Sequence, residues 1–144
     1  MLRAFAVITS LVLVVAFAGC GPSGPPRVTV KGKLVKGGAP LPVPRADIGL
    51  GWVQMELIPA DGNSSKQHEM TRTKEDGTFE FIGEGDGIAT GDYRLSVIHF
   101  EQGPPNDKLK GAFSPEKTQI KISVPADKGS THDLGTIDLD NPPK

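Results

Sequence analysis

Apolar and polar residues alternate in short runs from residue 27 onward, and turn-forming residues interrupt these runs at short intervals. An alternation with period two places successive side chains on opposite faces of a β-strand, whereas an amphipathic helix repeats every 3.6 residues. The whole chain contains 18 glycines and 13 prolines, the residues that most strongly favour turns, and most of them lie beyond residue 27. No convincing helical pattern occurs in this region. The sequence therefore predicts an all-β domain built as a sandwich or a barrel.

Seven segments are expected to form strands, and two of them have a predicted place in their sheet. The segment 92–100 has apolar residues on both faces near its end, which indicates a central strand, and 67–74 is mostly polar, which indicates an edge. The seven predicted strands are 27–36, 52–58, 67–74, 78–82, 92–100, 118–124 and 133–139. This number of short strands in one domain predicts a single seven-stranded antiparallel β-sandwich.

Two local motifs fit such a fold. Asp76-Gly77 separates two predicted strands and supplies the positive φ angles that a tight hairpin turn requires. Tyr93, the only tyrosine, follows Gly91-Asp92 at the start of a strand. This arrangement resembles the tyrosine corner of sandwich folds, in which the phenol bonds to a nearby backbone group. We therefore expect Tyr93 to be structural.

Several segments together resemble a known family. They are Val30-Lys31-Gly32-Lys33-Leu34-Val35, Gly38-Ala39-Pro40-Leu41, Val53–Pro59, the T-x-x-D-G-x-F pattern of Thr73–Phe79, the G-x-Y-x-L-x-V pattern of Gly91–Val97, and the stretch 111–120. Over residues 28–139 the chain resembles transthyretin-like, carboxypeptidase-regulatory-like domains of bacterial surface lipoproteins. The resemblance implies a transthyretin-like or immunoglobulin-like sandwich over residues 28–140, followed by a tail, 141–144. The stretch from Val43 to Gly51 is longer than the connection usual in that family.

Cys20 is the only cysteine, and it ends an export-like segment. Arg3 is followed by an apolar stretch, 4–19, that is shorter than the roughly 20 residues a helix needs to cross a bilayer. Phe17-Ala18-Gly19-Cys20 resembles the lipobox of bacterial lipoproteins, although Phe17 stands where an aliphatic residue is usual. We expect a signal peptide over 1–19 and a lipidated Cys20 with a tether over 20–27. The alternatives are an ordinary secretory signal with an incidental cysteine and a retained membrane helix.

The resemblance to lipoproteins implies an anchor at Cys20 made of a diacylglyceryl group and an amine-linked acyl chain such as palmitate. Each buried methylene contributes about 0.8 kcal/mol, so two or three chains anchor a protein stably. Gly21 favours the outer membrane, because Asp at that position favours retention in the inner one. The expected location is the bacterial cell envelope, with the membrane as a partner through the lipid.

Composition and motifs give no support for catalysis or nucleic-acid binding. The formal net charge is −1, too low for a nucleic-acid partner. No G-x-S-x-G elbow occurs, and lipidation of Cys20 would leave no thiol. His99 and Glu101 could reach one ion at a strand end, but a histidine exposed to water is the alternative there. We therefore expect no enzyme activity, no cofactor and no metal site.

Trp52, the only tryptophan, begins a predicted strand. It could pack in the core or at its rim, or it could present a stacking face to a sugar. The leading hypothesis is a non-enzymatic, lipid-anchored envelope domain that acts as a structural or protein-interaction module. The alternative is a module that binds carbohydrate or another ligand at the cell surface through Trp52 and the 43–51 loop. Envelope proteins and polysaccharide are the corresponding partners.

Overall fold

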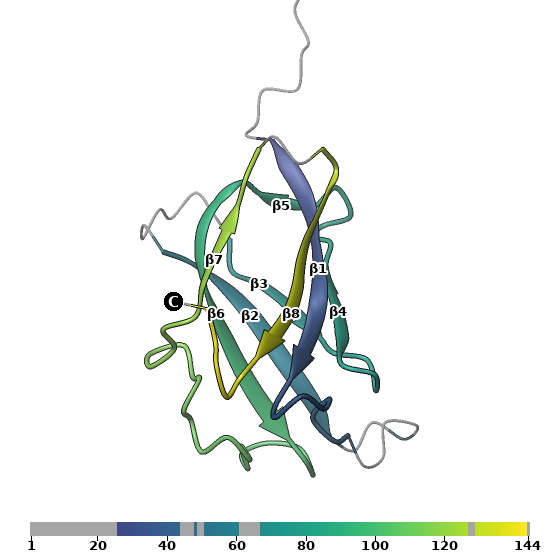
Figure 1. Cartoon of the computed structure of the whole chain (residues 1–144), viewed down its shortest axis with the longest axis vertical. Helices are drawn as coiled ribbons and strands as arrows, with labels where there is room; N and C mark the ends of the chain where they lie inside the picture. Colours follow the sequence, from purple (N-terminus) through teal and green to yellow (C-terminus); the bar gives the residue numbers. More distant parts are fainter. Residues whose placement is uncertain (1–25, 44–47, 49–50, 61–66, 127–128, 144) are drawn as a thin grey trace, which may run out of the picture.

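The computed structural model describes residues 26–43, 48, 51–60, 67–126 and 129–143. Within these residues the chain is all-β, with eight strands and no α-helix (Figure 1). The strands are β1 (Arg27–Val35), β2 (Trp52–Pro59), β3 (Glu69–Arg72), β4 (Thr78–Phe81), β5 (Ile88–Ala89), β6 (Gly91–Phe100), β7 (Lys121–Val124) and β8 (Thr131–Asp138). The predicted strands all have counterparts. The sequence did not indicate β5.

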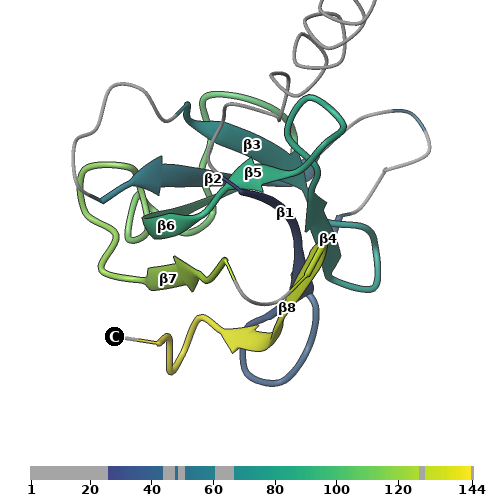
Figure 2. The same ribbon diagram turned by 90° about the horizontal axis from the view of Figure 1, so that it is seen from above.

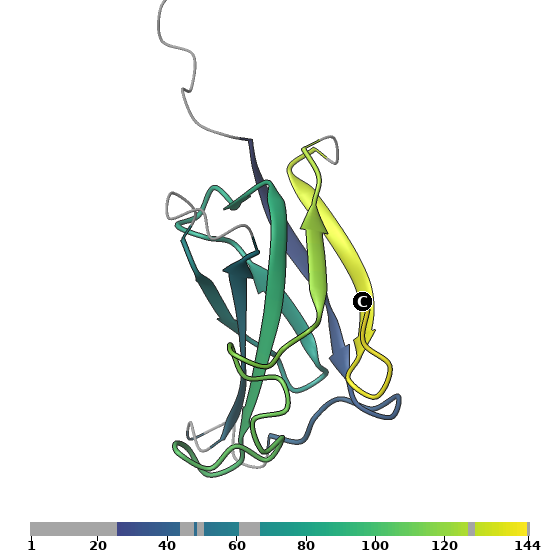
Figure 3. The same cartoon turned by 90° about the vertical axis from the view of Figure 1, so that its left-hand side faces the viewer.

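The strands form two four-stranded sheets that lie face to face, an arrangement consistent with a β-sandwich (Figures 2 and 3). In sheet 1, β1 pairs with β4, β5 and β8. In sheet 2, the strand order is β3-β2-β6-β7. The predicted positions of two strands are confirmed, because β6 lies between β2 and β7 and β3 lies at an edge.

The pairing of β1 with β8 departs from the antiparallel expectation, because these two strands run parallel. Their register shifts between Lys31 and Lys33, where the partners jump from Asp133 to Thr136. The strand period is two in parallel and antiparallel sheets alike, so side-chain alternation cannot distinguish the two directions. The expectation of a wholly antiparallel sandwich was therefore wrong for this pair.

The Asp76-Gly77 turn is formed, but it joins the two sheets. Gly77 has φ +81°, its N–H donates to the Lys74 carbonyl at 2.9 Å, and Asp76 accepts from the Thr78 N–H at 2.9 Å. Beyond the turn, β3 pairs with β2 and β4 pairs with β1. Where β3 and β4 separate into the two sheets, the Thr71 hydroxyl donates to the Glu80 carbonyl at 2.8 Å. The predicted hairpin is thus a corner between sheets.

One hydrophobic core fills the space between the sheets, and apolar side chains from both sheets contribute to it. Its buried members are Val28, Val30, Leu34, Leu41, Val53, Met55, Leu57, Phe79, Phe81, Ile88, Tyr93, Leu95, Val97, Ile120, Ile122, Val124, Ile137 and Leu139. The Tyr93 hydroxyl donates to the Ala89 carbonyl at 2.6 Å. This bond links β6 of sheet 2 to β5 of sheet 1 and confirms the tyrosine corner.

An irregular segment covers the edge of β6 beyond β7. The predicted strand 118–124 is regular only from Lys121, but its earlier part still pairs, since Leu95 N–H donates to the Ile120 carbonyl at 2.9 Å. Val97 N–H donates to the Phe113 carbonyl at 2.9 Å. The Thr118 side chain donates to the Leu95 carbonyl, which takes the place of a ladder bond. Sheet 2 therefore has a protected edge at β6.

Candidate functional site

The strongest candidate site lies on the outer face of sheet 2, at the end where β2 begins and β6 ends. Side chains of directly paired residues project from the same face of a sheet. Trp52 pairs with Phe100, and Gln54 pairs with both Ile98 and Arg72. Because Val53 and Met55 point into the core, these residues point outward. We name the group of Trp52, Gln54, Met70, Arg72, Ile98 and Phe100 the Trp52 face.

Aromatic and cationic side chains contact one another on the Trp52 face. The rings of Trp52 and Phe100 have centroids 5.3 Å apart and planes inclined by 53°. The Arg72 guanidinium carbon lies 4.3 Å from the centroid of the Trp52 ring, a cation–π contact. The Gln54 amide nitrogen lies 3.8 Å from the Met70 sulfur. The sequence had indicated only Trp52 here, because the other members come together through strand pairing.

Apolar surface is exposed on this face. Met70 is 68% exposed, the highest value among the exposed large hydrophobic residues of the described chain. Trp52 is half-buried, and its indole N–H has no hydrogen-bond partner among the described residues. Trp52 thus packs at the rim, with one side of its ring occupied by Arg72.

The charged side chains around the Trp52 face differ in whether they have partners. His68 Nδ1 and Glu56 Oε1 lie 2.7 Å apart, and the Arg94 guanidinium donates to the Pro115 carbonyl at 2.9 Å. Glu101 pairs with Lys108 beyond the end of β6. Arg72 is exposed and has neither an ion pair nor a side-chain hydrogen bond among the described residues.

His99 and Glu101, the candidates for a shared metal ion, have separate partners. His99 is 5% exposed, and its Nε2 lies 2.7 Å from the Pro42 carbonyl, to which it donates. The Glu101 carboxylate pairs with Lys108. The expected water-exposed imidazole is instead buried and bonded to the backbone. Over the described ranges, no cluster of three or more histidine, cysteine or acidic residues is arranged to hold a metal.

Asp107, which the sequence did not single out, organises the loop after β6. Its carboxylate accepts hydrogen bonds from the backbone N–H groups of His99 at 3.0 Å, Leu109 at 2.9 Å and Gly111 at 2.8 Å. The bond to the residue two positions on is typical of aspartate in turns, and this local pattern could have indicated the role. Asp107 thereby supports the end of β6 that carries Phe100.

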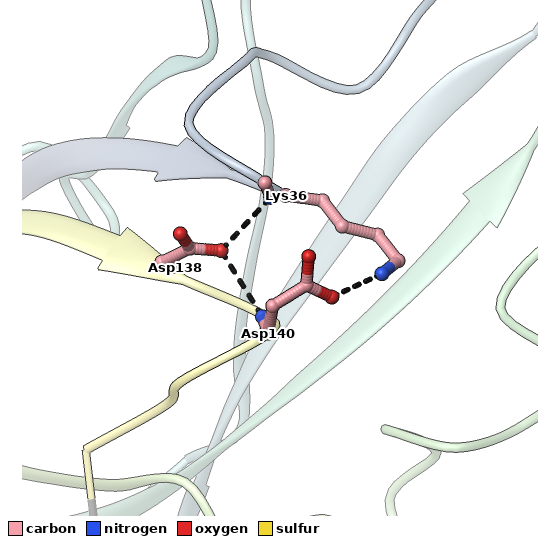
Figure 4. Close-up of polar contacts among 4 residues, drawn as sticks. Lys36, Asp138 and Asp140 are labelled. Carbon is pink, nitrogen blue, oxygen red and sulfur yellow. Dashed lines mark hydrogen bonds and ion pairs between the residues drawn. The ribbon is translucent and has the colours of Figure 1, made fainter.

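A second polar cluster joins the end of β1 to the chain after β8 (Figure 4). Asp138 Oδ1 accepts from the Gly37 N–H at 3.1 Å and from the Asp140 N–H at 3.0 Å. Lys36 pairs with Asp140, and both side chains are about half exposed. The carboxylates are engaged by backbone donors and a lysine in water, so the cluster is a structural clasp.

Among the hollows that the described residues line, two involve strands of sheet 1. One, of about 440 Å³, covers the outer face of sheet 1 and is lined by charged residues that include Lys31, Lys33 and Asp133. Lys31 and Asp133 lie 3.7 Å apart there. The other, of about 470 Å³, separates the edges of β7 and β8. In the first hollow, charges of both signs lie side by side in solvent.

Charges also gather at the end where β1 begins. Arg27 Nε lies 3.0 Å from Asp86 and donates to the Gly87 carbonyl at 3.1 Å. The pKa of Glu69 is raised above its ordinary value, mainly because the carboxyl is partly buried, with Glu84 and Asp86 nearby adding to the effect and Arg27 opposing it. This end of the sandwich is opposite to the end at which Trp52 and Phe100 lie.

Cys20, the predicted signal peptide and most of the predicted tether lie outside the described residues, as do 44–47 and 49–50 of the 43–51 loop. Within the described part of the chain, no helix has the length and apolarity to cross a membrane. A scan against protein-family models and a search of curated proteins found no match to this chain.

Proposed function

We propose that this chain is a lipid-anchored, non-enzymatic interaction module of the bacterial cell envelope. The observation that carries the proposal is the Trp52 face, on which Trp52, Met70 and Arg72 gather at the surface of an ordered sheet. Tryptophan, arginine and methionine are enriched in protein interfaces. The proposal also depends on Cys20 as the lipidated residue at the end of its export-like segment.

The topology supports presentation of this face away from the membrane. Arg27, the first residue of β1, pairs with Ala89, which lies just before β6 begins. Trp52 pairs with Phe100, where β6 ends. A ten-residue strand spans about 33 Å, so roughly that length separates the two ends. A lipid on Cys20 would hold the Arg27 end toward the bilayer and leave the Trp52 face accessible.

The same proposal includes a transthyretin-like fold for residues 28–140. The two packed sheets and the bond from Tyr93 to the Ala89 carbonyl support it, as do the turn at Gly77 and the motif resemblance. Sandwiches of this kind carry many unrelated functions, so the assignment of a role rests on the Trp52 face.

Carbohydrate binding is a second candidate. The aromatic pair of Trp52 and Phe100 lies beside the Gln54 amide, and aromatic rings with an amide suit the apolar faces and hydroxyls of sugars. Trp52 emission should then change with an envelope polysaccharide, and Trp52→Ala should abolish binding. Ile82→Ala, which removes a 51% exposed apolar side chain elsewhere, is the matched control.

The experiment that tests the proposal is photo-crosslinking in cells from position 70 of the full-length lipidated protein. One reproducible protein partner, identified by mass spectrometry and absent when the crosslinker is moved to position 82, is the expected result. Polysaccharide fragments alone would favour the second candidate. In the same cells, Cys20→Ser should release the protein from the membrane fraction, and unchanged membrane association would refute the anchor.

A further inference from the structure

We propose that the Trp52 face docks an acidic segment of a partner protein and that the Arg72 guanidinium binds a carboxylate of that segment. The inference rests on the proposed function and names the chemistry of its partner. Arg72 lies on β3, the edge strand of sheet 2, and is exposed. It carries a positive charge without an acidic partner in the described part of the chain.

The position of Arg72 over the Trp52 ring prepares it for such a contact. Its guanidinium carbon lies 4.3 Å from the centroid of the Trp52 ring. A guanidinium that stacks through its face retains its in-plane N–H donors, whose fork matches the two oxygens of a carboxylate. Because the ring already restricts the side chain, less conformational entropy is lost when the carboxylate binds.

The charges nearby point to the same partner. Glu56 is engaged by His68, and Glu101 is engaged by Lys108. The Arg94 guanidinium lies outside the Trp52 face and donates to the Pro115 carbonyl. Arg72 is the charged member of the Trp52 face, and a negative group complements it.

The apolar neighbours of Arg72 favour a protein segment as the source of the carboxylate. Met70 is 68% exposed, two residues away on the same face, and Trp52 and Phe100 extend the apolar surface. A segment that covers them removes water from Arg72, which strengthens a charge-assisted hydrogen bond. A sugar ring would instead have to displace the guanidinium to stack on that side of Trp52, whereas a carboxylate leaves the stack intact.

The test uses the purified full-length lipidated protein in detergent micelles, with emission of its single tryptophan as the readout. The ligands are blocked five-residue peptides in which Glu or Asp is flanked by Val, Leu or Phe, each matched by a copy with Gln or Asn. Acidic peptides should change the emission saturably and should bind at least about tenfold more tightly than their amide copies, as expected for a charge-assisted bond.

Variants at Arg72 locate the contact. Arg72→Gln should weaken acidic peptides about tenfold, and Arg72→Lys should also weaken them, because an ammonium has no planar fork. Lys74→Gln removes the same charge two residues along the chain and should leave binding unchanged. Equal affinity for acidic and amide peptides, or binding that survives Arg72→Gln, overturns the inference.

The remaining outcomes separate this inference from the proposed function. A response to a glucose oligomer or to a galacturonate oligomer, without one to any acidic peptide, overturns the inference in favour of a glycan. No response to any acidic peptide at millimolar concentration also overturns it. If crosslinking from position 70 still captures a reproducible partner in that case, the interaction module stands and only its acidic partner is lost.

Discussion

In sheet 2, β2 and β6 pair over eight consecutive residues without a register shift, whereas in sheet 1 the partners of β1 change along its length. β1 pairs with β5 and then β4 on one side, and its parallel pairing with β8 shifts at Gly32. The outer faces also differ. Sheet 2 carries the Trp52 face, and the outer face of sheet 1 is a polar hollow in which Lys31 and Asp133 lie near each other.

The comparison indicates where a fixed binding surface can be built. A regular antiparallel ladder holds directly opposed side chains in constant register, so Trp52 and Phe100 meet at a defined geometry. The exposed opposite charges of the hollow on sheet 1 contribute little to stability, because water solvates and screens them. Sheet 1 still contributes buried side chains such as Leu34 and Phe81 to the core, although its pairing is irregular.

The largest expected effect concerns the irregular sheet. A Cβ added at Gly32 would lie 2.8 Å from the Phe79 ring and 2.9 Å from the Gly135 carbonyl oxygen, which belongs to the shifted part of β8. Gly32→Ala should therefore lower the free energy of unfolding by about 1–3 kcal/mol, as overpacking usually does. Urea unfolding followed by circular dichroism measures this. Lys33→Ala, one residue along the strand, should cost less than about 0.5 kcal/mol. Equal stability of the two variants would mean that sheet 1 accommodates the added methyl group without a loss of stability.

The bond between the two sheets gives the next effect. Tyr93→Phe removes the hydrogen bond from β6 to the Ala89 carbonyl of β5 and keeps the ring in the core. We expect a loss of about 1 kcal/mol in the free energy of unfolding. Hydrogen exchange should show increased opening of residues 88–91, while the ladder between β2 and β6 stays protected. A uniform loss of protection across both sheets would contradict a local role for this bond.

The sequence predicted the strands with clear alternation and missed features that depend on pairing. β6 was found almost residue for residue because its apolar positions alternate, whereas β5 has two residues, too few to show a period. Side-chain alternation does not reveal whether β8 runs parallel or antiparallel to β1. At the candidate site, Trp52 stands out as the single tryptophan, but its neighbour Arg72 is twenty residues away in the chain. Only the pairing of β2 with β3 brings them together.

A smaller effect compares the two outer faces directly. Arg72→Gln removes the cation–π contact with Trp52 and should lower the free energy of unfolding by about 0.5–1 kcal/mol. Lys31→Gln on sheet 1 removes an exposed ion pair with Asp133 and should change it by less than about 0.5 kcal/mol. The emission maximum of Trp52 should shift in the Arg72 variant alone. A larger loss of stability in Lys31→Gln than in Arg72→Gln would contradict this ranking of the two outer faces.

The smallest effect occurs where charges of the two sheets meet. Glu69 of β3 pairs with Leu57, so it projects from the core side of sheet 2, and its pKa is raised mainly by partial burial, with Glu84 and Asp86 adding to the effect. Inward-pointing charges of this kind protect edge strands from pairing with other chains. A carboxyl whose pKa rises on folding binds its proton more tightly in the folded state. The stability that this gives is full below the unfolded pKa and is lost as pH rises through the raised value.

Glu69→Gln should consequently match the wild type near about pH 4 and be slightly more stable at neutral pH, by a few tenths of a kcal/mol for a group this solvated. Urea midpoints measured across this range give the difference, and Glu75→Gln on the exposed turn is the control. A variant less stable than wild type at neutral pH would show that attraction to Arg27 outweighs burial. The attraction between Glu69 of sheet 2 and Arg27 of sheet 1 would then stabilise the contact between the two sheets at that end.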